Sequence, residues 1–478
     1  MLFYVLCFAQ SVRTLHPKPQ ITLKLDCMGV LLQAFYWDCP RLENKEFEWW
    51  DFVKEKIKGL SDAGFTALWL PPACKAANSV SMGYDPYDFY DLGNIDQKGS
   101  VKTWFGSKNA LELLIAEAHK YNMQVYADMV LNHTSGADAQ EVNGYDGKTR
   151  WTKYDVGSGK FNRDWTCYHP SWFERWDDEG FEGMPDLCHR NPAVYTALVE
   201  YARWMIEEIG FDGFRYDFAK GYGTWLITAI LERLYTKNGK TNFSPFGVGE
   251  YWDSDAPITQ WLRETNAFSD NPVHAFDFPL RERLKNLCDF YGFKLTTLTQ
   301  RGTLINNGLE GWAVTFVENH DIVHVEPIVN DKMLAYAYIL THEGYPCVFW
   351  QDYFNWDLAQ TDNNSGIAAL VRLHEEYAGG DTDVLYCDDN LYIMQRKGNG
   401  AQNGLVFVLN NADQWNGKSV DTKWHNTKLL AKAWRGKDNT DVPADKWTDD
   451  YGSSDIWAPP RGYVVYVPAT NQTNGHEL

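Results

Sequence analysis

The sequence predicts an α/β fold: a closed (β/α)8 TIM barrel with an inserted subdomain after the third strand and an all-β sandwich domain at the C-terminal end. Three observations predict it. Short apolar stretches alternate with stretches of helical spacing along most of the 478 residues. A polar segment rich in Gly and Trp interrupts this alternation from Thr134 to about His189. From about Asp381 onward, short alternating runs replace the helical pattern, as is typical of an all-β unit.

Eight strand candidates carry the barrel prediction, because alternating strands and helices imply a parallel sheet and eight such units imply closure. A doubly wound open sheet competes with the barrel, but it normally has fewer strands. The strand candidates are Val30–Trp37, Ala67–Pro72, Gln124–Val130, Gly213–Phe218, Phe246–Glu250, His274–Phe278, Ala313–Val317 and Pro346–Trp350. The helical stretches are Phe47–Ala63, Lys108–Tyr121, Pro192–Ile209, Thr224–Tyr235, Ala256–Thr265, Leu280–Tyr291 and Lys332–His342. The alternating C-terminal runs are Leu391–Gln395, Gly404–Leu409 and Gly462–Val467.

These patterns divide the chain into four parts. We expect a possible signal or leader remnant at 1–22, the barrel at 23–133 and 190–380, the inserted domain B at 134–189, and the β-sandwich domain at 381–478. The run Leu2–Ala9 is apolar but far too short to span a bilayer, and no Lys or Arg precedes it. We expect an extracellular protein, with a cytoplasmic one as the alternative.

The net charge and the aromatic content indicate which classes of molecule the protein binds. There are 44 Lys and Arg residues and 64 Asp and Glu residues, which gives a formal net charge of −20. Such a charge argues against nucleic acid or an anionic membrane as a partner. Aromatic residues make up 15 %, including 21 Trp and 27 Tyr. Flat ring faces pack against sugar rings, so this excess favours a carbohydrate ligand, although a Trp-rich core explains it equally well.

The nine cysteines are spread from Cys7 to Cys387 and include no CxxC pair. A cysteine-based zinc site therefore has little support. Some of these cysteines could form disulfides, but the sequence does not say which.

Acidic residues lie where four of the predicted strands end. In a parallel barrel, the carboxyl ends of the strands meet on one face, and that face carries the active site. One Asp at a strand end is more often a helix cap or a salt-bridge partner. Four such ends on one face are harder to explain structurally, because crowded carboxylates repel one another. The strand-end residues are Asp128, Asn132 and His133; Arg215 and Asp217; Glu250; and Glu318, Asn319, His320 and Asp321.

Three carboxylates suit the hydrolysis of a glycosidic bond, in which one attacks the anomeric carbon and another protonates the leaving oxygen. Arg215 lies two residues before Asp217, so both side chains share one face of the strand, and the guanidinium would keep Asp217 ionised. Glu250 has an apolar and two aromatic neighbours, and such surroundings raise the pKa of a carboxyl group.

Taken together, these segments resemble the α-amylase family of glycoside hydrolases. The motifs DMVLNH, GFRYDFAKG, GVGEYW and VENHD occur in the family's order and spacing. MPDL at Met184–Leu187, GYDPYDFYDLG from Gly83 and GYPCVFWQD near the eighth strand are also similar to family segments. The resemblance covers about Val30 to Asp352 and is greatest to archaeal-type α-amylases and their bacterial relatives.

The resemblance implies a role for each matching residue. Asp217 would be the nucleophile, Glu250 the general acid and base, and Asp321 the residue that holds the hydroxyl groups of the distorted sugar. Tyr84 would stack on the sugar ring. The remaining expected substrate contacts are Arg215, His133, His320, Lys220 and Trp252. Asp128 is interpreted as a structural partner within the site.

The resemblance also implies a structural Ca²⁺ ion, which prefers a mixed set of oxygen ligands. Its expected ligands are Asn132, Asp186, Asp178 and the carbonyl groups of Gly180 and Gly221. The adjacent cysteines of archaeal-type relatives are replaced by Trp176 and Asp177, so we expect no zinc. No Arg or Lys occurs from Met333 to Asp357, where chloride-dependent members carry a basic ligand, so we expect no chloride activation.

The expected function is retaining endo-hydrolysis of α-1,4-glucosidic bonds in starch, glycogen and maltooligosaccharides, by a monomer. An exo-acting maltooligosaccharide hydrolase or a transglycosylase shares the three acids and is the first alternative. A non-catalytic glycan-binding relative is the second. Such a relative would be expected to have lost the nucleophile or the acid, and this sequence retains Asp217, Glu250 and Asp321.

Overall fold

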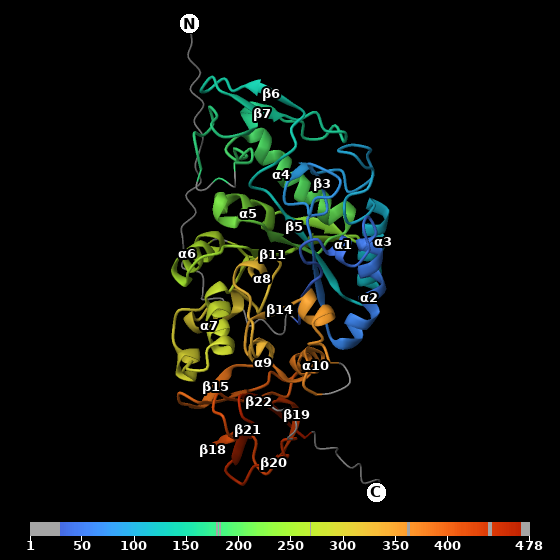
Figure 1. Cartoon of the computed structure of the whole chain (residues 1–478). Helices are drawn as coiled ribbons and strands as arrows, with labels where there is room; N and C mark the ends of the chain where they lie inside the picture. Colours follow the sequence, from blue (N-terminus) through green and yellow to red (C-terminus); the bar gives the residue numbers. More distant parts are fainter. Residues whose placement is uncertain are drawn as a thin grey trace.

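Eight parallel strands form a closed barrel at the centre of the molecule (Figure 1). The structure is a computed structural model that describes residues 29–177, 180, 183–267, 269–360, 364–437 and 442–469. The order of strands around the barrel is β1-β14-β13-β12-β11-β8-β5-β2. Their bounds are β1 Leu31–Gln33, β2 Ala67–Leu70, β5 Gln124–Met129, β8 Gly213–Tyr216, β11 Phe246–Gly249, β12 His274–Phe276, β13 Ala313–Phe316 and β14 Tyr345–Phe349.

Each barrel strand lies within a predicted apolar run, except that β14 begins one residue earlier, at Tyr345. The barrel is closed rather than open. The prediction of a closed parallel barrel is therefore confirmed. All four residues of β8 are buried, and so are all four of β13, because helices cover the outside of the barrel and side chains fill its interior.

Helices connect the strands, and local signals fix several of their ends. Ser107 caps α3 by accepting a hydrogen bond from the Ala110 N–H, and Asn191 caps α4 in the same way. Gly64, with φ 102°, ends α2. The α-helices are α1 Cys39–Leu42, α2 Trp49–Ala63, α3 Lys108–Lys120, α4 Pro192–Trp204, α5 Thr224–Leu231, α6 Asp255–Asn266, α7 Phe278–Asp289, α8 Ile322–Val325, α9 Lys332–Ile339 and α10 Ile367–Tyr377. The 3₁₀ or π segments are η1 Trp165–Cys167, η2 Met205–Ile209, η3 Ala219–Gly221, η4 Leu295–Thr299, η5 Ile305–Asn307, η6 Glu310–Trp312 and η7 Gln351–Asn355.

One predicted helix is too long. The stretch Thr224–Tyr235 was expected to be helical throughout, but α5 ends at Leu231. Tyr235 instead begins a hairpin of β9 (Tyr235–Lys237) and β10 (Lys240–Phe243). Asn238 and Gly239 form the turn between these strands with positive φ angles, 51° and 74°. An Asn-Gly pair between two strands is a strong hairpin signal, so the boundary was readable from the sequence.

The segment between β5 and α4 has no long helix among its described residues, as predicted. It contains the hairpin of β6 (Ala139–Val142) and β7 (Thr149–Lys153) and the short turn η1. It lies beyond one side of the barrel, at the top of Figure 1. A second small hairpin, β3 (Lys75–Ala76) with β4 (Pro86–Asp88), follows β2.

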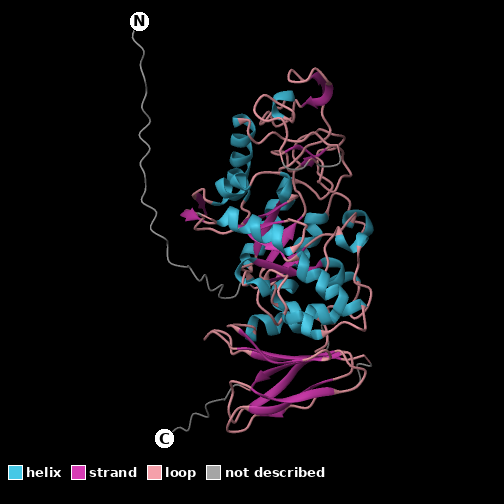
Figure 2. Cartoon of the chain, turned by 90° about the vertical axis from the view of Figure 1, so that its left-hand side faces the viewer, coloured by secondary structure: helices cyan, strands magenta, loops and turns pink. Residues whose placement is uncertain are grey.

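The C-terminal region is an antiparallel β domain at the opposite side of the barrel from the insert (Figure 2). Its six-stranded sheet has the order β15-β16-β17-β22-β19-β20, and β18 pairs with β21 as a second layer. A separate apolar cluster, including Ile393, Val408 and Ile456, fills the space between the layers. The strands are β15 Thr382–Cys387, β16 Leu391–Arg396, β17 Leu405–Asn410, β18 Asn416–Asp421, β19 Lys428–Arg435, β20 Lys446–Trp447, β21 Ser453–Ala458 and β22 Gly462–Pro468. The exact domain boundaries stay a prediction.

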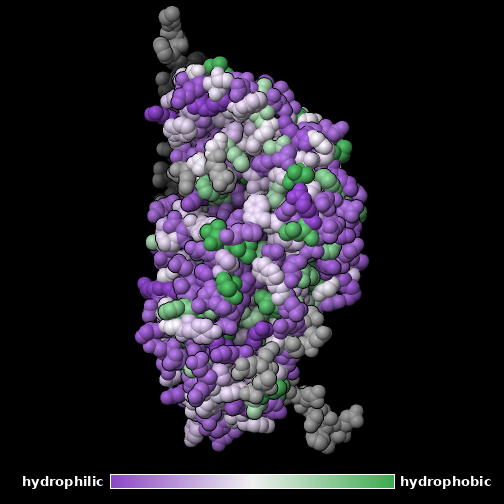
Figure 3. All heavy atoms as spheres, in the orientation of Figure 1, coloured by the Kyte–Doolittle hydropathy of each residue, from purple (hydrophilic) through white to green (hydrophobic). Residues whose placement is uncertain are grey.

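Hydrophilic residues dominate the face of the molecule shown in Figure 3, and apolar residues form only scattered patches on it. This surface agrees with the excess of acidic over basic residues. Among the described residues, no helix has both the length and the apolar composition that crossing a membrane requires.

Candidate active site

Arg215 binds three of the strand-end carboxylates at the carboxyl end of the barrel. It lies in β8, level with Asp128 of β5 on one side and Val248 of β11 on the other. Its Nη1 atom is 2.8 Å from Oδ1 of Asp128 and 2.6 Å from Oδ1 of Asp217, and its Nη2 atom is 3.0 Å from Oε2 of Glu250. The guanidinium is buried, so these charge-assisted contacts are poorly screened by water.

Glu250 directly follows β11 and is held with its carboxyl group inside the site. Its Oε2 atom accepts a hydrogen bond of 2.8 Å from the backbone N–H of Phe218. Phe218 itself has φ 44° and ψ 48°, a left-handed conformation that is uncommon for an aromatic residue. Burial raises the pKa of Glu250 to about 8, and the neighbouring Asp217 adds to the shift while Arg215 opposes it. A carboxyl group with this pKa carries a proton at neutral pH.

Asp128 is buried beneath the other acids and is fully engaged. Its Oδ2 atom accepts hydrogen bonds from the Tyr84 hydroxyl at 2.8 Å and from the Trp69 indole N–H at 3.0 Å, while Oδ1 faces Arg215. Burial raises its pKa, and Arg215 opposes this. These contacts fit the interpretation of Asp128 as a structural partner that holds Arg215 and Tyr84 in place.

Asp321 follows β13 and is the most exposed acid of the group, with 32 % of its side chain accessible. Its Oδ2 atom is 3.2 Å from Nε2 of His320, and its Oδ1 atom is 3.2 Å from Nε1 of Trp37. The His320 ring stacks on Tyr84 with the centroids 5.1 Å apart and the planes at 13°. Burial lowers the pKa of His320 well below its usual value, so this imidazole is neutral.

The other expected substrate contacts lie around this centre. His133 is buried, and its Nε2 atom donates to the backbone oxygen of Tyr84 at 2.9 Å, so it supports Tyr84 from below. The Lys220 ammonium group in η3 lies 5.9 Å from the centre of the Phe218 ring. Trp252 is 39 % exposed and stacks on Phe278 with the centroids 5.4 Å apart. The structure brings the three acids together with Arg215, His320 and Tyr84. His133, Lys220 and Trp252 lie at the margins of this group.

Sequence reasoning missed three residues next to the acids: Trp37 contacts Asp321, Trp69 contacts Asp128, and Gln33 contacts His320. Gln33 ends β1, Trp37 follows it by four residues, and Trp69 lies in β2. The motifs that the sequence matches lie elsewhere in the chain, so none of them contains these three residues. Asking which polar or aromatic side chains end every barrel strand would have found them.

Two expected cation ligands lie together where the insert meets the barrel. Asn132 and Asp186 are buried, and both side-chain atoms of the Asn132 amide, together with Oδ1 of Asp186, have no hydrogen-bond partner within the described chain. Gly221 approaches them closely, because a Cβ atom placed on it would lie 2.3 Å from Oδ1 of Asn132. Buried oxygens without donors are what a cation with oxygen ligands requires, so this donor set fits Ca²⁺.

A second carboxylate, which the sequence analysis did not name as a ligand, joins this group. Asp177 has a buried Oδ2 atom that lacks a hydrogen-bond partner among the described residues, and a ligand atom of Asp177 lies within 4.8 Å of ligand atoms of Asp186 and His169. The nominated Asp178 lies outside the described residues, and Gly180 is exposed. Asp178 therefore stays a prediction, and Asp177, one position before it, is a further candidate ligand.

The same corner contains sulfur and nitrogen donors. His169, Glu174 and Cys188 each place one ligand atom within 4.8 Å of the others. The sequence argues against zinc because it lacks the pair of adjacent cysteines found in archaeal-type relatives. The group of His169, Glu174 and Cys188 does not involve those positions. The expectations of no zinc and no chloride activation therefore stay predictions.

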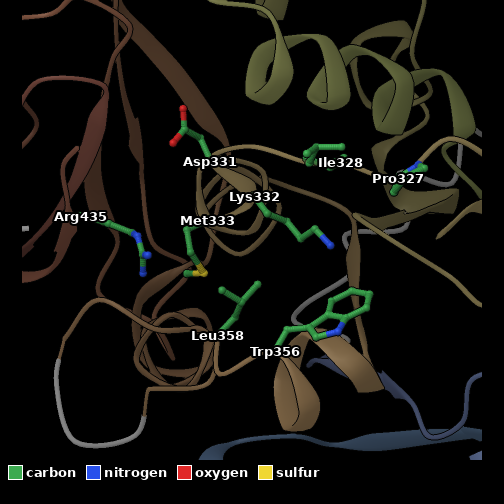
Figure 4. Close-up of a pocket in the computed structure, with 9 residues that line it drawn as sticks. Pro327, Ile328, Asp331, Lys332, Met333, Trp356, Leu358 and Arg435 are labelled. Atoms are coloured by element: carbon green, nitrogen blue, oxygen red, sulfur yellow. The ribbon is translucent and has the colours of Figure 1, made fainter. Parts of the chain in front are cut away.

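A separate pocket of about 420 Å³ lies between the barrel and the β domain (Figure 4). Its cations are already engaged: Lys332 contacts Asp352 at 2.8 Å and lies over the Trp356 ring, and Arg435 donates to Gln360. We therefore interpret this pocket as part of the structural interface between the barrel and the β domain. Its lining residues are Pro327, Ile328, Val329, Asp331, Lys332, Met333, Trp356, Leu358 and Arg435.

Comparisons with known proteins identify relatives over most of the chain. A family model described as the catalytic domain of alpha amylase matches residues 44–353. The chain is 29 % identical over 499 residues to an α-amylase of Geobacillus stearothermophilus, covering 92 % of this chain and 88 % of the relative. It is 29 % identical over 436 residues to a glucan 1,4-alpha-maltohexaosidase of Bacillus sp. strain 707, covering 80 % of this chain and 82 % of that protein.

The fold has the same kind of match among solved structures. The α-amylase of Geobacillus thermoleovorans, solved as a complex with acarbose, superposes with a TM-score of 0.63 at 20 % identity. The alignment covers 92 % of this chain and 97 % of that one. At this identity the likeness concerns the fold, and it includes the insert and the C-terminal β domain as well as the barrel.

Proposed function

Since this chain belongs to the α-amylase family and is an α-glucan hydrolase, we propose that it cleaves internal α-1,4-glucosidic bonds in starch, glycogen and maltooligosaccharides with retention of configuration. One observation carries the proposal: Asp217 and Glu250 face the two terminal nitrogens of a single buried guanidinium, with Asp321 beside them. Two carboxyl groups held this close suit a nucleophile and an acid on opposite sides of one glycosidic bond.

In the first step, an oxygen of Asp217 attacks the anomeric carbon and forms a covalent glycosyl ester. The bond to the leaving oxygen breaks, and Glu250 donates its proton to that oxygen. Arg215 contacts Oδ1 of Asp217 at 2.6 Å and so holds this carboxyl group in position. The raised pKa of Glu250, about 8, supplies the proton at neutral pH.

In the second step, water replaces the leaving group. Glu250 is now ionised and removes a proton from that water, whose oxygen attacks the anomeric carbon and breaks the ester bond to Asp217. Each step inverts the configuration, so the product keeps the α configuration of the substrate. Asp321, His320 and Tyr84 would hold the sugar between the carboxylates, and Lys220 and Trp252 would lie toward the leaving-group side.

The proposal includes one structural Ca²⁺ ion held by Asn132, Asp186 and the backbone of Gly221, with Asp177 as a further ligand. The support is the set of buried oxygens without donors. The ion would fix the insert to the barrel beside the active site and would take no part in bond cleavage. A monomeric, extracellular enzyme, with a cytoplasmic one as the alternative, completes the proposal on sequence grounds alone.

The relative named as a maltohexaosidase keeps an exo-acting or product-specific hydrolase as the second candidate, because its identity of 29 % equals that of the Geobacillus stearothermophilus α-amylase. Transglycosylation uses the same covalent intermediate and differs only in the acceptor that attacks it.

A time course on soluble starch beside a short maltooligosaccharide tests the proposal. We expect rapid loss of iodine staining with mixed oligosaccharides, and freshly released ends in the α form by NMR. Slow loss of staining with one small product indicates the exo-acting candidate, and products longer than the short substrate indicate transglycosylation. Fresh product in the β form would exclude the retaining mechanism.

A further inference from the structure

Two residues in and just after β1 contact the His320–Asp321 pair. Gln33 is the last residue of β1 and is completely buried in the barrel. Trp37 follows four residues later and is partly exposed at the mouth of the site. Neither belongs to the motifs that identify the three acids, and neither has a role in the chemistry proposed above.

The contact of Gln33 determines which nitrogen of His320 carries the proton. The amide nitrogen of Gln33 lies 2.9 Å from Nδ1 of His320 and can only donate. Nδ1 is then an acceptor without a proton, so the neutral ring carries its proton on Nε2. That atom faces Oδ2 of Asp321 at 3.2 Å, where a carboxylate oxygen needs a donor. The amide and the carboxylate therefore favour the same tautomer from opposite sides of the ring.

The contact of Trp37 fixes the other oxygen of the same carboxylate. Its indole Nε1–H donates to Oδ1 of Asp321 at 3.2 Å. Its ring packs against His320 and Tyr84, with centroid distances of 5.4 and 5.5 Å. Each oxygen of Asp321 thus has its own donor, and the plane of the carboxylate is set by two groups that pack against one another.

We propose that Gln33 and Trp37 are positioning residues for Asp321: Gln33 holds His320 in the Nε2–H tautomer, and Trp37 holds Oδ1 of the carboxylate. The inference rests on the proposed function, in which Asp321 holds the distorted sugar. A carboxylate fixed at both oxygens contacts the sugar hydroxyls in one orientation, so less reorganisation is needed as the transition state forms.

Other charged groups also face this pair and must be kept constant in any test. The charges of Arg215 and Asp217 act on His320, and so does His324 of α8, which also acts on Asp321. The hydroxyl of Tyr84 is engaged by Asp128 rather than by His320. Substitutions at Gln33 and Trp37 leave all of these groups in place, so changes at His320 and Asp321 report the two contacts.

The first experiment measures the tautomer of His320 in the free enzyme, by NMR of protein labelled with ¹⁵N-histidine. The His320 signals are assigned as those missing from a His320→Gln sample. We expect a neutral ring protonated at Nε2 in the wild type, and a mixture of tautomers in Gln33→Met, which keeps the side-chain volume but cannot donate. Gln260→Met, on the exposed face of α6, is the matched control and should not alter the ring. A proton on Nδ1 in the wild type, or an unchanged tautomer in Gln33→Met, would overturn the role of Gln33.

The second experiment separates positioning from structure by kinetics on a short maltooligosaccharide. Trp37→Phe keeps an aromatic ring and removes the N–H. We expect kcat to fall roughly 10- to 100-fold, the range for losing a hydrogen bond to a charged group, with little change in KM or melting temperature. Trp172→Phe, at a Trp that is 68 % exposed on the insert, is the control and should change neither. A kcat for Trp37→Phe within twofold of this control would overturn the role of Trp37.

The two experiments distinguish this inference from the proposed function. A wild-type enzyme without activity on any α-glucan would remove the proposed function, whereas the tautomer measured in the free enzyme would still decide the role of Gln33. An active enzyme whose two variants match their controls would leave the proposed function intact and remove the inference.

Discussion

At the scale of single residues, Arg215 offsets part of the negative charge that the active site gathers. One buried guanidinium faces Asp128, Asp217 and Glu250, and three carboxylates exceed the charge that it can neutralise. The site resolves the excess by protonation: burial and the neighbouring Asp217 raise the pKa of Glu250 to about 8. A protonated acid beside an ionised nucleophile is the arrangement that glycoside hydrolysis needs, so the requirement for charge balance and the requirement for catalysis coincide.

Asp217→Asn tests the nucleophile. The amide keeps the size and a contact to Arg215 but cannot form the glycosyl ester, so kcat on starch should fall roughly 10⁴-fold or more while starch binding persists. Turnover and binding to immobilised starch are the measurements. Asp455→Asn, an exposed carboxylate on β21, is the matched control and should behave as the wild type. Near-normal turnover in Asp217→Asn would remove this residue as the nucleophile.

Glu250 should set the alkaline limb of the pH profile. Catalysis needs its proton, so kcat/KM should fall as the pH rises through about 8. Stability follows the same group: its pKa is raised on folding, so its stabilising contribution is complete below the unfolded value near 4.5 and is lost as the pH rises through about 8. Glu250→Gln cannot ionise, so it should melt above the wild type at pH 9 and lose this advantage toward pH 4.5. An advantage that is constant with pH would contradict the assigned pKa.

At the scale of elements, the sequence predicted the eight strands because each is a short apolar run closed by polar residues. The sequence analysis did not predict α10, which begins at Ile367, because this helix follows the last barrel strand and has no further barrel strand after it. The predicted helix extends to Tyr235, the first residue of β9, because the apolar helix α5 closely precedes this residue. Periodicity thus identifies elements well, and it fails at junctions where turn chemistry, here Asn238 and Gly239, overrides it.

The site was predictable to the extent that its residues lie in contiguous segments. Asp217, Glu250 and Asp321 each lie in a motif at the end of a predicted strand, so the motif and the place in the fold indicate the same residues. Gln33 and Trp37 act through contacts with residues nearly 290 positions away in the chain, and no spacing in one sequence reports such a pairing. The expected cation ligands in the insert stay a prediction, because the insert has few regular elements that would fix the positions of its residues from sequence alone.

The short segment η3 should couple cation binding to the active site. Gly221→Ala would place a Cβ atom 2.3 Å from Oδ1 of Asn132 and 2.6 Å from the Phe218 ring, so the amide must move. We expect a lower melting temperature and a weaker stabilisation by Ca²⁺ than in the wild type, measured by thermal unfolding in chelator and after calcium is restored. Gly59→Ala, in the middle of α2 with no atom near the new methyl group, is the control and should raise stability by roughly 0.5–1 kcal/mol. An identical calcium response in Gly221→Ala would contradict the site.

At the scale of the whole molecule, Arg461 connects the β domain to the barrel. It is buried at the start of β22, where its Nη2 atom donates to the backbone oxygens of Leu287 and Cys288 at 2.6 and 2.7 Å. Its Nε atom donates to Asp331 at 2.8 Å, in the loop before α9. One side chain thus ties the end of α7 and the start of α9 to the sheet, and both helices belong to the half of the barrel that carries Asp321.

Arg461→Met should therefore separate the unfolding of the two parts. The substitution keeps an apolar stem but leaves two backbone oxygens and Asp331 without their donor, which costs roughly 2–5 kcal/mol. Because the lost contacts lie between the units rather than within them, calorimetry should resolve two transitions, with the β domain melting first. Arg301→Met, at an exposed position of the barrel, is the control and should melt like the wild type. If Arg461→Met unfolds in a single transition at the wild-type temperature, the contact between the barrel and the β domain does not depend on this residue. The apolar packing between α9 and β22 must then hold the domains together.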